Sequence, residues 1–498
     1  MNLALITPEI TLFCGAISVL MADVFFAKRR VFAGNFYLIS YLISLVFCTL
    51  SAFLLFKNID IGGELAFSKM FLVNPLTNYA KLVILFLLTL IIYISRSFLD
   101  AEKKVSAEFL ALLMIATTGS MLLVSANDLI SLYLAIELQA LSLYLLAAIR
   151  RDSLKSSEAG MKYFILGSVA SGILLFGISM IYGFAGSTNF QALRVFYSHR
   201  PDLIQLTILL GFVMVITAMF FKISAAPFHM WTVDVYEGSS SIVTIFFATI
   251  VKLSAIIILL RIFTDLLIYW NGINQILIFC AILSLFIGSF GAIKQHNFKR
   301  LLAYSSIGHI GFILLAFGAL SYEGMKSVIL YILVYVLISV GTFGFLNLIE
   351  DLSAEAGEKI GQNTNIDQKN NLIFDISSLA GLSKTNPLMA FCLAILMFST
   401  AGIPPLAGFF AKFYVFVAFI GSGHIALAVI AILFSLISAY YYLRIVKIMY
   451  FDRPKPGGSI VADNFNIKLV IFLSAMINLL FVGFLNYTLL TITDILKL

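Results

Sequence analysis

Runs of about twenty apolar residues, separated by short polar stretches, follow one another from Leu3 to the C-terminus. An α-helix needs roughly 20 apolar residues to cross the hydrocarbon core of a bilayer. The pattern therefore predicts an all-α integral membrane protein of about fourteen transmembrane helices. The predicted spans are 3–25, 33–56, 74–94, 107–125, 128–149, 160–184, 203–225, 240–262, 273–293, 301–320, 326–349, 387–419, 424–449 and 466–494.

Two of the predicted helices are interrupted by proline at comparable places. The seventh runs into Pro227, and the twelfth contains Pro404 and Pro405. Proline removes an amide donor and breaks helix geometry, and paired broken helices are typical of the ion pathway of a transporter. We expect helices 4–8 and 9–13 to form two five-helix repeats, inverted because an odd number of helices starts the second copy on the other face. The alternative is two unrelated proline kinks.

This pattern predicts four parts of the chain. They are an N-terminal three-helix region at 1–106, a first five-helix repeat at 107–262, a second at 263–450 and a C-terminal helix at 451–498. The second repeat contains a polar loop at 350–386, with a tract of mixed charge from Gly361 to Asn371. Its simplest interpretation is a flexible surface connection of no catalytic importance.

Composition and charge agree with a membrane protein. The chain is 61% hydrophobic and 11% charged, whereas a soluble domain carries roughly 25% charged residues. With the N-terminus outside, most Lys and Arg residues gather at cytoplasmic ends of the spans, which explains the net charge of +7 without nucleic acid. We therefore expect both termini in the periplasm and a bacterial inner (plasma) membrane, with mitochondrial encoding as the alternative. The run from Leu3 to Phe26 lacks a cleavage site and predicts a retained helix.

The sequence offers no site for redox chemistry. Its four cysteines lie far apart, each within an apolar stretch, so neither a disulfide framework nor a metal site is predicted. No Gly-rich phosphate loop opens a helix after a strand. We expect any flavin, nucleotide or iron-sulfur cluster to lie on other chains. The cysteines are Cys14, Cys48, Cys280 and Cys392.

Several ionisable residues fall inside the predicted helices, where a charge costs at least roughly 2.5–3.5 kcal/mol. Glu137 lies in the middle of the fifth span, and Lys162 lies near the start of the sixth. We expect these two to form an ion pair, in which each stabilises the charged form of the other. The alternatives are a protonated, static Glu137 and a Lys162 that extends to the interface.

Three further lysines and two histidines extend this series. Lys222 comes about one turn before Pro227, Lys252 lies within the eighth span, and Lys412 follows the second break. His229 and His309 can both donate and accept protons near neutral pH. Together with Glu137 and Lys162 they predict a lateral proton path; the alternative for each histidine is a satisfied structural residue. Four other charges have simpler interpretations: Asp234 and Glu237 as a solvated loop face, Lys299 and Arg300 as topology signals.

Three stretches resemble the antiporter-like subunits of respiratory complex I, the NADH-quinone oxidoreductases. They are Phe221–Gly238 with Lys252 thirty residues after Lys222, Lys299–Ile307 and Ala401–Phe409. The resemblance covers about 107–450 and is greatest to the N subunit. The twelfth helix carries Lys412 where the M subunit has a glutamate, and the chain stops before any lateral helix like that of the L subunit. Val233, Ser240 and Ile242 stand where many relatives have proline.

The resemblance implies that Glu137 and Lys162 form the coupling pair, that Lys222 and Lys252 with His229 form the central relay, and that Lys412 is a terminal proton site. NADH, FMN, iron-sulfur clusters and quinone are then expected in partner subunits. The implied partners are an M-type antiporter-like subunit, small K-, J- and A-type subunits, and lipid. Two alternatives remain: a subunit of a multisubunit sodium/proton antiporter or membrane-bound hydrogenase, and a structural subunit that moves no protons.

Overall fold

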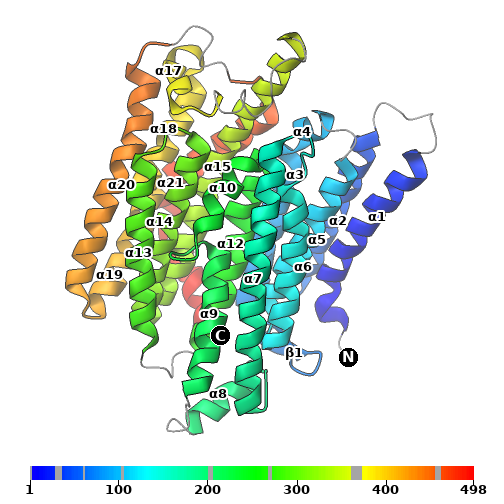
Figure 1. Ribbon diagram of the computed structural model, residues 1–498, viewed down its shortest axis with the longest axis vertical. Helices are drawn as coiled ribbons and strands as arrows, with labels where there is room; N and C mark the ends of the chain where they lie inside the picture. The colour runs from blue at the N-terminus through cyan, green and yellow to red at the C-terminus, as the bar shows by residue number, and fades with distance from the viewer. Residues whose placement is uncertain are drawn as a thin grey trace.

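The computed structural model describes residues 3–27, 36–59, 62–101, 106–199, 206–266, 272–360, 373–454 and 461–497. Within these ranges the chain is almost entirely helical, and the long helices run side by side (Figure 1). The all-α membrane fold predicted from the apolar runs is confirmed. The tract Gly361–Asn371 lies outside the described residues, as do Lys28, Arg29 and Arg30.

The elements of the first half are a 3-10 turn η1 (Leu3–Ile6), α1 (Thr7–Ala27), α2 (Phe36–Lys57), β1 (Glu64–Ala66), β2 (Phe71–Val73), α3 (Pro75–Ile94), α4 (Arg96–Ala101), α5 (Ser106–Ser125), α6 (Leu129–Ala147), α7 (Leu154–Ala185), α8 (Phe190–His199), α9 (Leu206–Ile223) and α10 (Met230–Gly238). Those of the second half are α11 (Ser241–Phe246), a π-helical turn η4 (Phe247–Val251), α12 (Lys252–Asp265), α13 (Ile273–Ile293), α14 (Phe298–Gly318), α15 (Tyr322–Ile360), η6 (Ile376–Leu379), α17 (Leu382–Thr385), α18 (Pro387–Ala401), α19 (Ala407–Gly421), α20 (Ile425–Phe451) and α21 (Phe465–Lys497).

Twelve helices of the described chain are long and apolar enough to cross a membrane. They correspond to twelve of the predicted spans. The predicted seventh span corresponds to the shorter α9, and the predicted twelfth is divided into α18 and α19. The total of fourteen crossings, the two inverted repeats and the four-part division of the chain stay predictions.

α15 is longer than its predicted span of 326–349. It has 39 residues and continues to Ile360, so Glu350 lies within a helix and not in the polar loop. The apolar pattern ends near Ile349, but a helix can continue beyond an apolar run, because several polar residue types also favour helix. Helix length therefore exceeded the apolar run by about ten residues.

A short β-hairpin was not predicted. β1 and β2 pair antiparallel, with Glu64 opposite Val73, and the hairpin lies at the same end of the molecule as α8 (Figure 1). Phe71 and Val73 pack with Leu5 in a small apolar cluster. The carbonyl oxygens of Lys69 and Met70 accept hydrogen bonds from Asn127, which ties the hairpin to the connection between α5 and α6.

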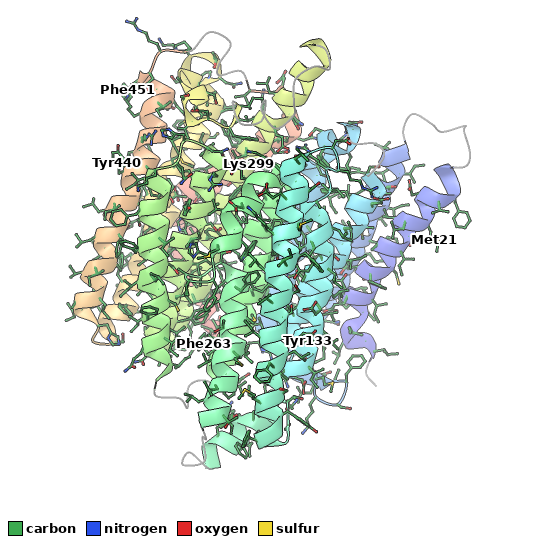
Figure 2. The ribbon with its side chains drawn as sticks, viewed as in Figure 1. Met21, Tyr133, Phe263, Lys299, Tyr440 and Phe451 are labelled. Atoms are coloured by element: carbon green, nitrogen blue, oxygen red, sulfur yellow. The ribbon has the colours of Figure 1, made fainter. Side chains whose placement is uncertain are left out.

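The outer surface of the bundle is apolar. Met21 on α1 and Phe451 on α20 point away from the protein, whereas Phe263 and Lys299 lie inside it (Figure 2). Phe451 is 80% exposed and Phe263 is 2% exposed. Large apolar patches are rare on soluble proteins, so this surface fits contact with lipid or neighbouring subunits.

One ion pair in the N-terminal region was not predicted. The Lys81 ammonium on α3 lies 2.6 Å from the Glu9 carboxylate on α1, and both side chains are almost fully buried. The ammonium also lies 4.7 Å from the centre of the Phe71 ring. The pair and its ring contact therefore join α1, α3 and the hairpin in the protein interior.

We predict that Lys81→Met destabilises the protein, because Glu9 would stay buried without its counter-charge. Breaking a buried pair costs about 3–5 kcal/mol, which a lowered thermal unfolding midpoint in detergent would report. The double variant Glu9→Gln/Lys81→Met should recover most of the loss. Lys447→Met serves as the control, because Lys447 pairs with Asp452 at the surface. Equal midpoints for Lys81→Met and the control would show that the pair contributes nothing.

Candidate functional site

Lys222 lies at the end of α9, directly before the first helix break. Its side chain is buried, and its ammonium has no hydrogen-bond acceptor within the described residues. Ser224 then turns the chain with φ of 66°, and the backbone carbonyl of Phe221 accepts a hydrogen bond of 2.9 Å from the Trp231 indole on α10. This indole closes the break, so that α10 folds back beside Lys222.

Lys252 is the first residue of α12, immediately after the π-helical turn η4. It is 1% exposed, and no acidic side chain pairs with it in the described chain. Its ammonium donates a short hydrogen bond to Ser306 and lies 3.5 Å from the Tyr335 hydroxyl. π-Helical turns occur often at functional sites, where they change the direction in which a side chain points.

His309 on α14 joins two tyrosines from different helices. Its Nδ1 lies 2.8 Å from the hydroxyl of Tyr331 on α15, and its Nε2 lies 3.3 Å from that of Tyr442 on α20. Tyr442 also hydrogen-bonds Ser305, which is adjacent to the Ser306 that contacts Lys252. His309 is therefore part of a continuous polar cluster around α14.

Lys412 on α19 lies against the second helix break. Its buried ammonium donates hydrogen bonds of 3.0 Å to the carbonyl oxygens of Thr400 and Ala401, and one of 3.1 Å to Ser435 on α20. The break leaves these carbonyls without helical partners, and a cation at a helix C-terminus is stabilised by them. The proline break thus provides the acceptors for this lysine. Both breaks contain a cis peptide bond, Ala226–Pro227 and Pro404–Pro405.

The expected pair of Glu137 and Lys162 is absent from this structure. The Lys162 ammonium lies 2.7 Å from Glu158, one turn away, and 2.7 Å from Asp234 on α10. Glu137 is half-buried on α6, and its Oε1 has no hydrogen-bond partner within the described residues. The physical reason is that α10 packs against α7 and brings a carboxylate to Lys162 that sequence order did not indicate.

His229 also differs from its expected place. It is half-buried at the start of α10, and no hydrogen bond joins it to Lys222 or Lys252 in the described chain. The direct bridge between the two lysines is therefore absent here. A path between them would need water or a rearranged side chain.

The interpretation of Asp234 and Glu237 as a solvated loop face is wrong. Both lie on α10, and Arg300 contacts both, at 3.2 and 2.6 Å. Burial by itself raises the pKa of each carboxyl, but hydrogen bonds from Lys162 to Asp234 and from Lys155 to Glu237, with those from Arg300, hold both pKa values below their usual range. Both carboxylates therefore stay charged at neutral pH and lose their ion pairs only in acid.

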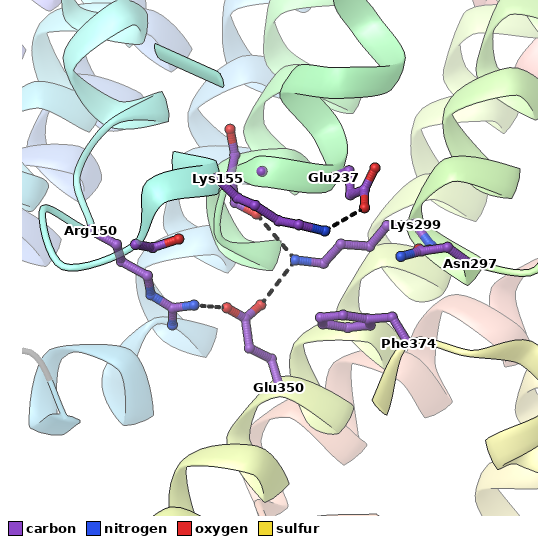
Figure 3. A pocket seen from close by; sticks show the side chains of 10 residues that line it. Arg150, Lys155, Glu237, Asn297, Lys299, Glu350 and Phe374 are labelled. Carbon is purple, nitrogen blue, oxygen red and sulfur yellow. Dashed lines mark hydrogen bonds and ion pairs between the residues drawn. The ribbon is translucent and has the colours of Figure 1, made fainter. Parts of the chain in front are cut away.

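A buried charged cluster at one end of the bundle was also missed. Lys299, expected to be a topology signal, is 2% exposed and lies 3.4 Å from Glu350. Glu350 pairs with Arg150 as well (Figure 3). It also accepts a hydrogen bond of 2.8 Å from the backbone of Ser241. Arg261 on α12 is also buried and donates hydrogen bonds to the carbonyls of Val124 and Ala126. The signal for the cluster was present, since Glu350 directly follows an apolar run.

Comparison with known proteins supports one family. Residues 126–438 match the family model described as NADH:quinone oxidoreductase/Mrp antiporter, transmembrane. The chain is 45% identical over 414 residues to an NADH-quinone oxidoreductase subunit N of Paramagnetospirillum magneticum, covering 80% of this chain and 81% of the relative. It is 41% identical over 479 residues to subunit N 1 of Rhizobium meliloti, covering 95% and 93%.

Solved structures agree. A chain of respiratory complex I from Thermus thermophilus superposes with a TM-score of 0.77 at 26% identity, covering 97% of this chain and 98% of that one. A chain of the Mrp complex from Dietzia superposes with a TM-score of 0.80 at 21% identity, covering 99% and 97%, which shows the fold alone. The chain therefore belongs to the family of antiporter-like NADH-quinone oxidoreductase N subunits.

Proposed function

We propose that the chain carries protons across the membrane arm of a translocating NADH:quinone oxidoreductase, through a lateral series of buried ionisable side chains. The observation that carries this is the placement of Lys222, Lys252 and Lys412. Each is at most 6% exposed, and none forms an ion pair within 4 Å of an acidic side chain in the described chain. An unpaired ammonium inside a membrane protein is costly, so such residues are retained for function.

The arrangement of polar groups supports a direction along the series. Lys252, in the first proposed repeat, contacts Ser306 in the second, where Ser305, Tyr442 and His309 add further polar groups. Lys412 ends the series, and Ser435 contacts it from α20, the helix that also carries Tyr442. We therefore assign Lys222 and Lys252 to the central relay and Lys412 to proton release.

The pair that couples this series to quinone reduction would work by exchange of partners. Lys162 binds Asp234 and Glu158 in this structure, while Glu137 is left without a hydrogen bond on one oxygen. We propose a second state in which Lys162 moves to Glu137. Such a move would change the electrostatic potential at Lys222 and so its affinity for a proton.

The setting of the proposed function follows from the family. NADH, FMN, iron-sulfur clusters and quinone would be bound by other subunits of the complex. The neighbours would be an M-type antiporter-like subunit and small K-, J- and A-type subunits in a bacterial inner membrane, with both termini of this chain in the periplasm. Purification of the tagged chain with mass spectrometry of its companions tests this setting.

We predict that Lys222→Met lowers the number of protons pumped per electron while the complex still assembles and reduces quinone, because methionine keeps the bulk but cannot hold a proton. The measurement is NADH-driven proton uptake into vesicles containing the purified complex. Lys447→Met, at an exposed position, is the control and should pump normally. Normal pumping by Lys222→Met would remove this lysine from the proton path.

The same assay separates a proton carrier from a structural subunit. Lys252→Met should also pump fewer protons in a fully assembled complex, since Lys252 holds its partners through hydrogen bonds to Ser306 and Tyr335 and through no ion pair in the described chain. A complex that falls apart on this substitution, without a prior loss of pumping, would favour the structural alternative.

We predict that Asp234→Asn weakens coupling, because it removes the carboxylate that holds Lys162 in the present state. Quinone reduction should continue while the ratio of protons to electrons falls. Asp452→Asn is the matched control, because Asp452 also pairs with a lysine, Lys447, at 2.8 Å but at the surface. An unchanged ratio for Asp234→Asn would rule out the exchange of partners at Lys162.

A further inference from the structure

A small pocket lies where the connection after α6 meets α7, α10, α14 and α15. Its lining contains five charged side chains, from Arg150, Lys155, Glu237, Lys299 and Glu350 (Figure 3). The free space is about 20 Å³. A cavity needs about 10–15 Å³ of free space to hold a water molecule, so the pocket has room for one.

The charges around this pocket are held by several helices at once. Lys155 pairs with Glu237 at 2.8 Å, and Lys299 donates to the backbone carbonyl of Ser239 at 3.1 Å as well as pairing with Glu350. A ring of three positive and two negative side chains thus surrounds the space. Such a ring fixes the orientation of a water between them more strongly than neutral groups would.

The hydroxyl groups of Ser239 and Ser240, beside the pocket, have no hydrogen-bond partner in the described chain. Ser239, which lines the pocket, is 1% exposed, and Ser240 is 2% exposed. Buried polar atoms almost always have a partner, and where the protein supplies none the usual partner is a buried water molecule. These two serines therefore indicate hydration that continues from the pocket into the protein.

The serines lie on the connection that leads to Lys252. They separate α10 from α11, and α11 continues through η4 to Lys252 at the start of α12. Tyr236, next to Glu237 on α10, is fully buried, and the centre of its ring lies 6.0 Å from the Lys252 ammonium. α10 thus carries both Glu237, which lines the pocket, and Tyr236, whose ring lies near Lys252.

We propose that this pocket is the site where protons enter the chain on their way to Lys252, carried by water held at Ser239 and Ser240. The site takes water as its ligand, and the proposal rests on the proposed proton-carrying function. In one step the neutral Lys252 amine gains a proton and becomes an ammonium. Each water along the way passes on one proton and receives another, and the adjoining aqueous phase loses one.

The test uses the intact complex reconstituted in vesicles. The double variant Ser239→Ala/Ser240→Ala removes both hydroxyls without adding bulk or charge. We expect a loss of protons pumped per electron, with normal assembly and quinone reduction. Ser40→Ala is the matched control, because Ser40 on α2 is also fully buried with an unpartnered hydroxyl, far from the pocket in the sequence. It should pump normally.

Further variants keep the result decisive. Ser239→Thr in the Ser240→Ala background restores a hydroxyl and should restore pumping, which a packing defect alone would not explain. If the double variant fails to assemble, Ser239→Ala alone decides by the same measurement. A ratio equal to that of Ser40→Ala would overturn the proposal.

The Lys252→Met variant, measured in parallel, distinguishes a failure of the entry site from a failure of the proton path through Lys252. If Lys252→Met loses pumping while the serine variants pump normally, only the entry site is wrong. If Lys252→Met itself pumps normally, the proton path through Lys252 is wrong, and the entry site falls with it.

Discussion

The cost of placing a charge where water is scarce governs this structure. In the N-terminal region the chain meets this cost with a carboxylate, as in the pair of Glu9 and Lys81. At Lys412 it uses backbone carbonyls released by a broken helix, and at Lys252 it uses hydroxyl groups. An ion pair fixes the charge of both partners, whereas carbonyl and hydroxyl acceptors leave a lysine free to lose its proton. The difference in partners thus separates the lysines that hold helices together from those suited to carry protons.

The sequence predicted the membrane fold and the buried lysines because both depend on position along an apolar run. Apolar runs surround Lys222, Lys252 and Lys412. How deep a residue lies within such a run can be read directly from the sequence. The proline signals also located both breaks correctly. These features need no knowledge of which helices are neighbours.

Lateral contacts could not be predicted in the same way. Lys162 was paired with Glu137 because their helices are consecutive, but the fold of α10 against α7 offers Asp234 instead. Tyr331 and Tyr442 were missed because a tyrosine in an apolar helix is common and carries no sign of its partner. Glu350 and Lys299 were assigned to surfaces because they mark the ends of apolar runs, yet helices from both halves of the chain cover them.

α20 carries two hydroxyl groups that contact different parts of the polar series. Ser435 and Tyr442 are seven residues apart on this helix, about two turns, so they point to the same side. One contacts Lys412, and the other contacts His309. Any rotation of α20 about its axis therefore moves both hydroxyls together. The contact with Lys412 and the contact with His309 would then form and break at the same time.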